Sequence, residues 1–362
     1  MTHPERRGPL SPEERRRVTR AAALRPLNVL VLVIGAGIFA TTLTWWVPPL
    51  TLVTYTLLVF LAARDPIFGR RVLHGRVEAA RSQGSMDQDV SREQWDATNY
   101  AAKDNLLRVV REEAESFFAL AEVPENWEAP TSSGHWQVRD IVGHLVDTTE
   151  GYIERFETTR GGDIAEALAP LTEMASTADQ RALEFRNVPR EELLARLHDA
   201  FGRAMKMFEG VEEQDWGTFM VTHAYMGPVP AFFYPIGQLM DYGVHGWDVR
   251  EGLQMPHYLT PDAADLLVPF MFVLWQATTD TSRLKGDLDV AVRVSGRNGG
   301  IYRVKVTQEG MTYEPGSVEG AQVVIDFDPA SLVLTAFGRA RSGTPYGDQD
   351  AGRRFAGLFF RI

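Results

Sequence analysis

Residues 238–250 read QLMDYGVHGWDVR and belong to a predicted helix that runs from about Pro230 to Gly252. Asp241 and His245 are separated by one helical turn, so both lie on the same face, close enough to share one metal ion. His144, in the segment DIVGHLVD, lies on the apolar stripe of a second predicted helix. It would supply a third ligand from across the core.

Two imidazoles and one carboxylate suit zinc, iron, nickel or manganese, and three protein ligands leave positions open for water or substrate. Asp248 and Asp140 are candidates to orient a ligating histidine, or alternatively to cap a helix or face water. The opposing interpretation is that an Asp-x-x-x-His pair is a weak signal. A lone histidine among apolar neighbours is more often a core residue than a ligand.

Apolar residues recur at three- and four-residue spacing in further segments, which predicts amphipathic helices. These helices cover Tyr100 to Leu120, a stretch after the Gly134-His135-Trp136 turn, and a stretch that starts at Pro189. Together with the segment around Asp241 they predict a four-helix bundle, whose interior is a usual place for a metal. One more core helix opens at Thr260 and Pro261.

The loop THAYMGPVPAFFYP, which precedes the helix of Asp241, contains His223 and Tyr225. Its glycine, prolines and aromatic residues leave two interpretations open. The two side chains either line the mouth of a pocket or simply pack. His135 is assigned to a turn, and the tryptophans near it to the core.

From about residue 285 the helical spacing gives way to alternation of apolar and polar residues, which predicts strands. Asn298-Gly299 is a hairpin turn signal between two of them. The predicted strands and the helices that follow are Leu288–Val294, Tyr302–Val306, Val323–Phe327, Pro329–Phe337 and Asp348–Phe360. Residues 285–362 are therefore expected to form a small α+β domain.

No charged residue occurs between Arg25 and Arg64, and Pro48-Pro49 divides this apolar stretch. Its length predicts two membrane spans, near Leu27–Trp46 and Pro49–Ala63, that form a transmembrane hairpin. Because arginines flank both outer ends, both termini and the soluble domains are expected in the cytoplasm of a multi-pass cell membrane protein. A cleaved signal peptide fits badly, since the apolar region is too long and lacks a cleavage site. A buried soluble hairpin is the other alternative.

The formal net charge is −11, yet arginines crowd the first part of the chain. The acidic remainder argues against nucleic acid as a partner. The sequence contains no cysteine, so a metal would need nitrogen and oxygen ligands. The expected organisation is mainly α and multi-domain: a basic cytoplasmic tail, the hairpin, a linker, the helical bundle and the α+β domain, over residues 1–26, 27–64, 65–96, 97–282 and 285–362.

Two segments resemble the mycothiol-dependent maleylpyruvate isomerase family. WEAPTSSGHWQVRDIVGHLVD, residues 127–147, resembles the start and second helix of their DinB-like metal-binding bundle, and DYGVHGWDVR looks like their acid-x-x-x-His-x-Trp-Asp motif. The resemblance, over roughly residues 100–280, implies that His144, Asp241 and His245 are the metal ligands. Asp241 stands where the best-characterised pattern has glutamate. Aspartate is one methylene shorter and still ligates zinc.

The tail of the sequence carries a further resemblance. VVIDFDPASLVLTAFGRARSG and YGDQDAGRRFAGLF are similar to the small carboxy-terminal domain of the same isomerases, which resembles sterol carrier proteins. Gly338-Arg339 and Gly347-Asp348 are the matching points. This resemblance makes Arg339 a candidate catalytic residue that would hold a substrate carboxylate. A surface or structural role for Arg339 is the alternative.

The resemblance implies that the open metal position binds the thiol of a low-molecular-weight cofactor such as mycothiol and presents it as a thiolate. The sequence therefore predicts a membrane-anchored enzyme of isomerase or S-transferase type that depends on a divalent metal, with zinc expected. A tether suggests an apolar small-molecule substrate, and maleylpyruvate itself is not expected because a soluble diacid needs no tether. The alternative is a non-enzymatic lipid- or small-molecule-binding module with a structural metal site. The oligomeric state does not follow from the sequence.

Overall fold

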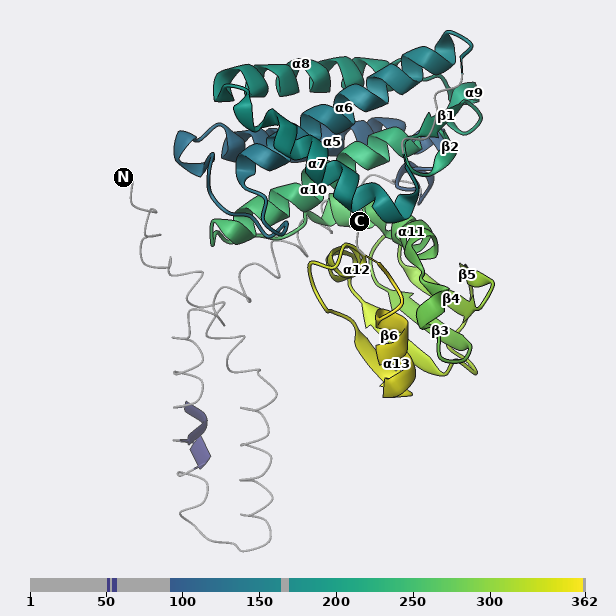
Figure 1. Cartoon of the computed structure of the whole chain (residues 1–362). Helices are drawn as coiled ribbons and strands as arrows, with labels where there is room; N and C mark the ends of the chain where they lie inside the picture. The colour runs from purple at the N-terminus through teal and green to yellow at the C-terminus, as the bar shows by residue number, and fades with distance from the viewer. Residues whose placement is uncertain (1–50, 53, 57–91, 164–168, 361–362) are drawn as a thin grey trace, which may run out of the picture. The chain divides into compact units, whose positions relative to one another are not determined.

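The structure is a computed structural model that describes residues 51–52, 54–56, 92–163 and 169–360. Contacts divide the chain into two compact units, residues 1–90 and 91–362. Within the second unit, Figure 1 shows a group of helices and a smaller part that contains a β-sheet. The prediction of a mainly helical chain with a sheet-containing C-terminal part is confirmed.

The predicted transmembrane hairpin, residues 27–64, lies outside the described residues apart from the helical positions 51–52 and 54–56. The predicted tail and nearly all of the predicted linker also lie outside them. In the part of the chain that the structure describes, no helix is both long and apolar enough to cross a membrane.

The apolar spacing predicted the main helices correctly. The helix that begins with the short 3-10 turn η2 (Tyr100–Ala102) packs against the helix of Asp241, and the helix of His144 packs against the one that follows Pro189. The helix predicted at Thr260 and Pro261 is also present. These helices are α5 (Lys103–Ala121), α6 (Val138–Arg160), α8 (Arg190–Glu209), α10 (Phe233–Gly252) and α11 (Pro261–Thr278).

One cluster of fully buried apolar side chains holds this bundle together. Phe117 from α5, Leu145 from α6, Leu197 from α8 and Tyr242 from α10 all belong to it. Burying a side chain of this size contributes roughly 1.5–3 kcal/mol. The cluster therefore fixes α6 beside α10, the two helices that carry the candidate ligands.

The start of α6 is set by a capping box, in which the Asp140 carboxylate accepts the backbone N–H of Gln137 at 2.8 Å. The same carboxylate pairs with Arg186 at 2.7 Å. Burial alone would raise the pKa of Asp140, but these hydrogen bonds lower it below its usual value. Asp140 therefore caps a helix, which was one of its predicted roles. It does not orient a histidine.

Several short elements between the main helices escaped the sequence analysis. The loop that contains His223 is a two-stranded antiparallel ribbon, so α10 begins at Phe233 and not near Pro230 as predicted. The polar segment before Pro189 forms another helix on α6. The elements are α7 (Met174–Glu184), α9 (Glu213–Trp216), β1 (Met220–His223) and β2 (Gly227–Pro230).

The C-terminal part is a mixed sheet with strand order β5-β4-β3-β6-β7. Strand β3 is central, antiparallel to β4 and parallel to β6, and the predicted hairpin at Asn298-Gly299 joins β3 to β4. Strands β5 and β7 were not predicted. The bounds are β3 (Leu288–Val294), β4 (Gly300–Thr307), β5 (Gly310–Pro315), β6 (Val323–Phe327), α12 (Pro329–Ala336), β7 (Thr344–Gly347) and α13 (Gln349–Ala356).

The last helix is shorter than the predicted Asp348–Phe360. Asp348 caps α13, as its side chain accepts two backbone N–H groups, but Gly357 ends the helix and Phe359 pairs with Thr279 in an isolated β-bridge. The Phe359 ring stacks on Trp275 of α11 with centroids 5.2 Å apart. Tertiary packing of the chain end therefore overrides the helical spacing.

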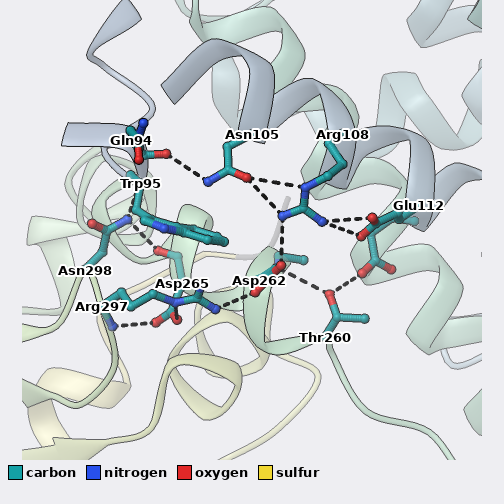
Figure 2. A network of polar contacts seen from close by, with 12 residues as sticks. Gln94, Trp95, Asn105, Arg108, Glu112, Thr260, Asp262, Asp265, Arg297 and Asn298 are labelled. Atoms are coloured by element: carbon teal, nitrogen blue, oxygen red, sulfur yellow. Dashed lines mark hydrogen bonds and ion pairs between the residues drawn. The ribbon is translucent and has the colours of Figure 1, made fainter. Parts of the chain in front are cut away.

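A polar network joins the sheet-containing part to the bundle (Figure 2). The Asn298 amide donates to the backbone carbonyls of Trp95 at 2.6 Å and Asp265 at 2.9 Å. Trp95 is buried, and the Arg297 guanidinium lies 3.5 Å from the centre of its ring. The end of the predicted linker, from the short turn η1 (Arg92–Gln94) onward, is therefore part of the folded unit.

Candidate metal centre

Helices α6 and α10 bring the three predicted ligands together. One candidate ligand atom from each of His144, Asp241 and His245 lies within 4.8 Å of the other two. The His144 Nε2 atom is 3.9 Å from an Asp241 carboxylate oxygen, and the two imidazole rings meet edge to face with centroids 5.2 Å apart. The predicted convergence from two separate helices is confirmed, whereas metal binding stays a prediction.

His245 is buried and held by Asp248, whose carboxylate lies 3.0 Å from Nδ1 of the imidazole. This contact leaves Nε2 as the ring nitrogen available to a metal. Burial lowers the pKa of His245, and Asp248 opposes that effect. A histidine that donates one N–H to a carboxylate and keeps the other nitrogen unprotonated is the usual form of a metal ligand.

Asp248 is itself fully buried, on the last turns of α10. It accepts hydrogen bonds from Nε and Nη2 of Arg339 at 3.0 and 2.8 Å. Burial alone would raise the pKa of this carboxyl, but the hydrogen bonds from His245 and Arg339 lower it. Of the two aspartates predicted as candidates to orient a histidine, Asp248 is the one that contacts a candidate ligand.

The Asp241 carboxylate provides a test of whether a cation fits. Its Oδ2 atom is buried and has no hydrogen-bond partner among the described residues. A buried carboxylate oxygen without a partner costs free energy, about 1–3 kcal/mol or more when charged. A positive ion between Asp241 and the two imidazoles would supply the missing interaction, so the donor set fits a divalent metal.

Trp136 lies beside both imidazoles, with ring centroids 5.1 Å from His144 and 5.9 Å from His245. Its indole N–H donates to Asp179 of α7 at 2.6 Å, and the same carboxylate contacts His135 at 3.0 Å. The tryptophan is buried, as predicted, and Asp179 fixes the ring against the candidate site.

The three candidate ligands line a cavity of about 930 Å³. Its walls come from α6, α7, the β1–β2 ribbon, α10, α11 and the turn after α12. Gly237 of α10 leaves room here for the Tyr152 side chain of α6, because a Cβ atom at this position would lie 2.6 Å from the Tyr152 hydroxyl. Of the two interpretations left open for His223 and Tyr225, the structure favours the lining of a pocket, since both residues line this cavity.

Arg339 reaches the site from the turn that follows α12. Gly338 has a φ of +66°, a conformation that glycine adopts without strain, and the turn places Arg339 on the cavity wall. The Arg339 guanidinium donates hydrogen bonds to Asp248, to the Phe337 carbonyl at 3.0 Å and to the Ser133 hydroxyl at 3.3 Å. These contacts position Asp248 and through it His245. Binding of a substrate carboxylate by Arg339 stays a prediction.

Tyr152, Arg155, Asp179 and Arg181 also line the cavity and were missed from the sequence. For Tyr152 a signal existed, since it lies two helical turns after His144 on the same face of α6. Asp179 and Arg181 could not have been found in this way. Their helix α7 has a mostly polar sequence without an apolar stripe.

Comparison with known proteins gives a family match over part of the chain. Residues 107–250 match the mycothiol maleylpyruvate isomerase N-terminal domain. No curated protein sequence matches this chain. The match does not reach beyond residue 250, so the predicted resemblance of residues 285–362 to sterol carrier proteins stays a prediction.

Solved structures show weaker likenesses. A crystal structure of the mycothiol-dependent maleylpyruvate isomerase has a TM-score of 0.48 at 12% identity, over 67% of this chain and 92% of that one. A mutant of the same enzyme gives 0.47 at 13% identity, over the same shares. The stereoselective inverting sec-alkylsulfatase Pisa1 from Pseudomonas sp. gives 0.22 at 14% identity, over 60% of this chain and 30% of that one.

The matched residues 107–250 include His144, Asp241 and His245. The stretch of this chain that builds the candidate metal centre is therefore similar to the N-terminal domain of mycothiol maleylpyruvate isomerases.

Proposed function

We propose that His144, Asp241 and His245 hold one divalent metal ion, with zinc expected, in an enzyme that uses a low-molecular-weight thiol as its cofactor. The reaction is an isomerisation or an S-transfer. The observation that carries this proposal is the convergence of the three side chains on a cavity wall, where Asp241 Oδ2 is buried without a partner among the described residues. The similarity to mycothiol maleylpyruvate isomerases supports a thiol such as mycothiol.

The residues of this chain have defined tasks in such a site. The sequence contains no cysteine, so a reactive thiol must come from a cofactor. A divalent ion held here would lower the pKa of a thiol bound to it and so favour the nucleophilic thiolate. Asp248 and Arg339 hold His245 in one orientation, and Trp136 packs over both imidazoles. A cavity of about 930 Å³ has room for a cofactor and a small substrate.

Metal analysis of the purified full-length protein tests the proposal. We expect about one divalent ion per chain, and a loss of affinity beyond about 100-fold in His144→Ala and His245→Ala, because each removes a ligand. His198→Ala is the matched control, since this exposed histidine of α8 pairs with Glu122 far along the chain from the site. It should bind metal like the wild type.

The thiol is tested separately in cobalt-substituted protein. Addition of mycothiol should produce the charge-transfer absorption of a cobalt–thiolate bond, a signal that does not depend on knowing the substrate. The metal site would be overturned if the wild-type protein contained no metal. It would also be overturned if His144→Ala and His245→Ala bound metal as tightly as the wild type. Metal-free protein that co-purifies with a lipid would favour the non-enzymatic binding module.

We also propose that residues 27–64 anchor the protein in the cell membrane with its soluble domains on the cytoplasmic side. The support is the uncharged stretch and the arginines that flank it. Full-length protein should remain in the membrane fraction after carbonate extraction, and a variant without residues 1–64 should become soluble. Release of the full-length chain by carbonate would contradict the anchor.

A further inference from the structure

The proposed metal site does not use two histidines that line the cavity, His135 and His223, and His223 lies at the end of β1. Its half-buried ring lies among those of Tyr152, Phe233 and Tyr234, with centroid separations of 6.3, 5.9 and 6.2 Å. All of these contacts except the one with Tyr234 involve residues that line the cavity. The imidazole is therefore held in an aromatic part of the cavity wall.

The hydrogen bonds of His223 define which ring nitrogen carries the proton. Nδ1 accepts the backbone N–H of Tyr225 at 3.3 Å, so the proton of the neutral ring is on Nε2. No described residue accepts a hydrogen bond from Nε2. His223 lines the cavity, and its Nε2 atom is not among the fully buried nitrogen and oxygen atoms without a partner. The cavity wall therefore contains an N–H donor for which none of the described residues is an acceptor.

The surroundings keep this donor uncharged. Burial, with a smaller contribution from the charge of Arg155, lowers the pKa of His223 to about 4, although Asp241 acts in the opposite direction. Burial also raises the pKa values of Tyr152 and Tyr225, so both phenols are neutral at physiological pH. A carbonyl oxygen can accept a hydrogen bond from this neutral donor without needing a counter-charge, and the surrounding rings offer apolar surface to the rest of a ligand.

The arginines that line the cavity already have protein partners. Arg155 donates to the Thr222 carbonyl at 2.9 Å, Arg181 pairs with Asp147 at 3.0 Å, and Arg339 pairs with Asp248 at 2.8 Å. These contacts engage part of each guanidinium, whereas no described residue accepts a hydrogen bond from Nε2 of His223.

We propose that the cavity binds an uncharged substrate with an apolar or aromatic body, whose carbonyl oxygen accepts a hydrogen bond from Nε2 of His223. The body packs against Tyr152 and Phe233. This inference rests on the proposed function in that it assigns a substrate class to the same cavity. It concerns residues other than the metal ligands, and its test scores the loss of His223 separately from the loss of metal.

Benzylideneacetone is a suitable probe, since it joins a phenyl ring to an uncharged conjugated ketone, and the chain has no thiol that could add to it. Binding to the full-length protein is measured by calorimetry, and the carbonyl stretch of the bound probe by isotope-edited infrared spectroscopy. Trans-cinnamate, of the same shape but anionic, is the matched ligand. Each titration is run with and without EDTA, so that loss of metal is scored separately from loss of His223.

We expect His223→Phe to weaken benzylideneacetone binding about tenfold and to abolish the lowered carbonyl frequency, because the ring stays while the donor is lost. His223→Gln should retain most of both effects, since its amide can donate from a similar position. Equal binding and an unchanged frequency in His223→Phe would overturn the proposal. Tighter binding of trans-cinnamate that depends on His223 would do so as well. If the effects of His223→Phe on binding and on the carbonyl frequency persist in EDTA, they come from His223 and not from the metal.

Discussion

Two buried aspartates on α10 and α11 each receive an arginine from the C-terminal part of the chain. Asp248 accepts two hydrogen bonds from the Arg339 guanidinium, at 3.0 and 2.8 Å. Asp265 accepts one from the Arg297 guanidinium at 2.8 Å and one from its backbone N–H at 3.0 Å (Figure 2). Each carboxylate thus accepts two hydrogen bonds from one arginine, yet the two carboxyl groups differ in pKa and in what else they contact.

The pKa of Asp248 is lowered and that of Asp265 is raised. Burial favours the protonated acid in both, but Asp248 has an imidazole as well as a guanidinium to stabilise its charge. At Asp265 burial outweighs Arg297, which is shared with Asp262. Both contacts join the helical bundle to the C-terminal part of the chain. Only the Arg339–Asp248 contact is linked to the candidate metal centre, because only Asp248 also holds a candidate ligand.

The largest difference is expected on removing the arginines. Arg339→Met should weaken metal binding about 10- to 100-fold, because Asp248 would lose the partner that fixes it against His245. It should also lower the free energy of unfolding by about 3 kcal/mol, since a fully buried carboxylate loses its counter-charge. Metal titration followed by chelation and urea unfolding measure the two effects. Unchanged metal affinity would show that Asp248 holds His245 without help.

Arg297→Met is the matched control for that variant. It should cost about 1–2 kcal/mol of unfolding free energy, less than Arg339→Met, because Arg297 is more exposed and its backbone N–H still donates to Asp265. Its metal affinity should equal that of the wild type. Loss of metal in Arg297→Met would mean that the metal site depends on all the contacts between the bundle and the C-terminal part, and not on Asp248 alone.

The smallest expected effect is a pH dependence of the free energy of unfolding. It arises from Asp262 and Asp265 in the network of Figure 2, which does not include the candidate ligands. Burial raises the folded-state pKa of Asp265, so its contribution to stability should increase as pH falls from neutral through that pKa towards 3.8. At Asp262 burial acts in the same sense, but hydrogen bonds from Arg297 and Arg108 lower the pKa. The contribution of the Asp262 carboxylate to stability should be present above pH 3.8 and should decrease as the pH falls below that value.

Urea unfolding of the wild type, Asp265→Asn and Asp262→Asn from neutral pH to a pH well below 3.8 measures this difference. The stability advantage of the wild type over Asp265→Asn should grow with acidification, and its advantage over Asp262→Asn should shrink. Two parallel trends would show that both carboxyl groups have the same environment.

Much of the helical core was predictable because apolar spacing reports which face of a helix is buried. Leu106, Leu145 and Leu197 were assigned to core faces and are fully buried. The same spacing placed His144 on the bundle-facing stripe of α6. The ribbon β1–β2 was not predictable, since its strands are four residues long and β2 contains two prolines, which usually indicate a loop.

The sequence by itself determined the three candidate ligands, because helical periodicity aligns Asp241 with His245 and the motif around His144 indicates a partner helix. Only the tertiary structure decided what surrounds them. Asp248 meets Arg339 across 91 residues of chain, and the ribbon brings His223 to the same cavity. Such contacts depend on the packing of whole elements, which local spacing does not encode.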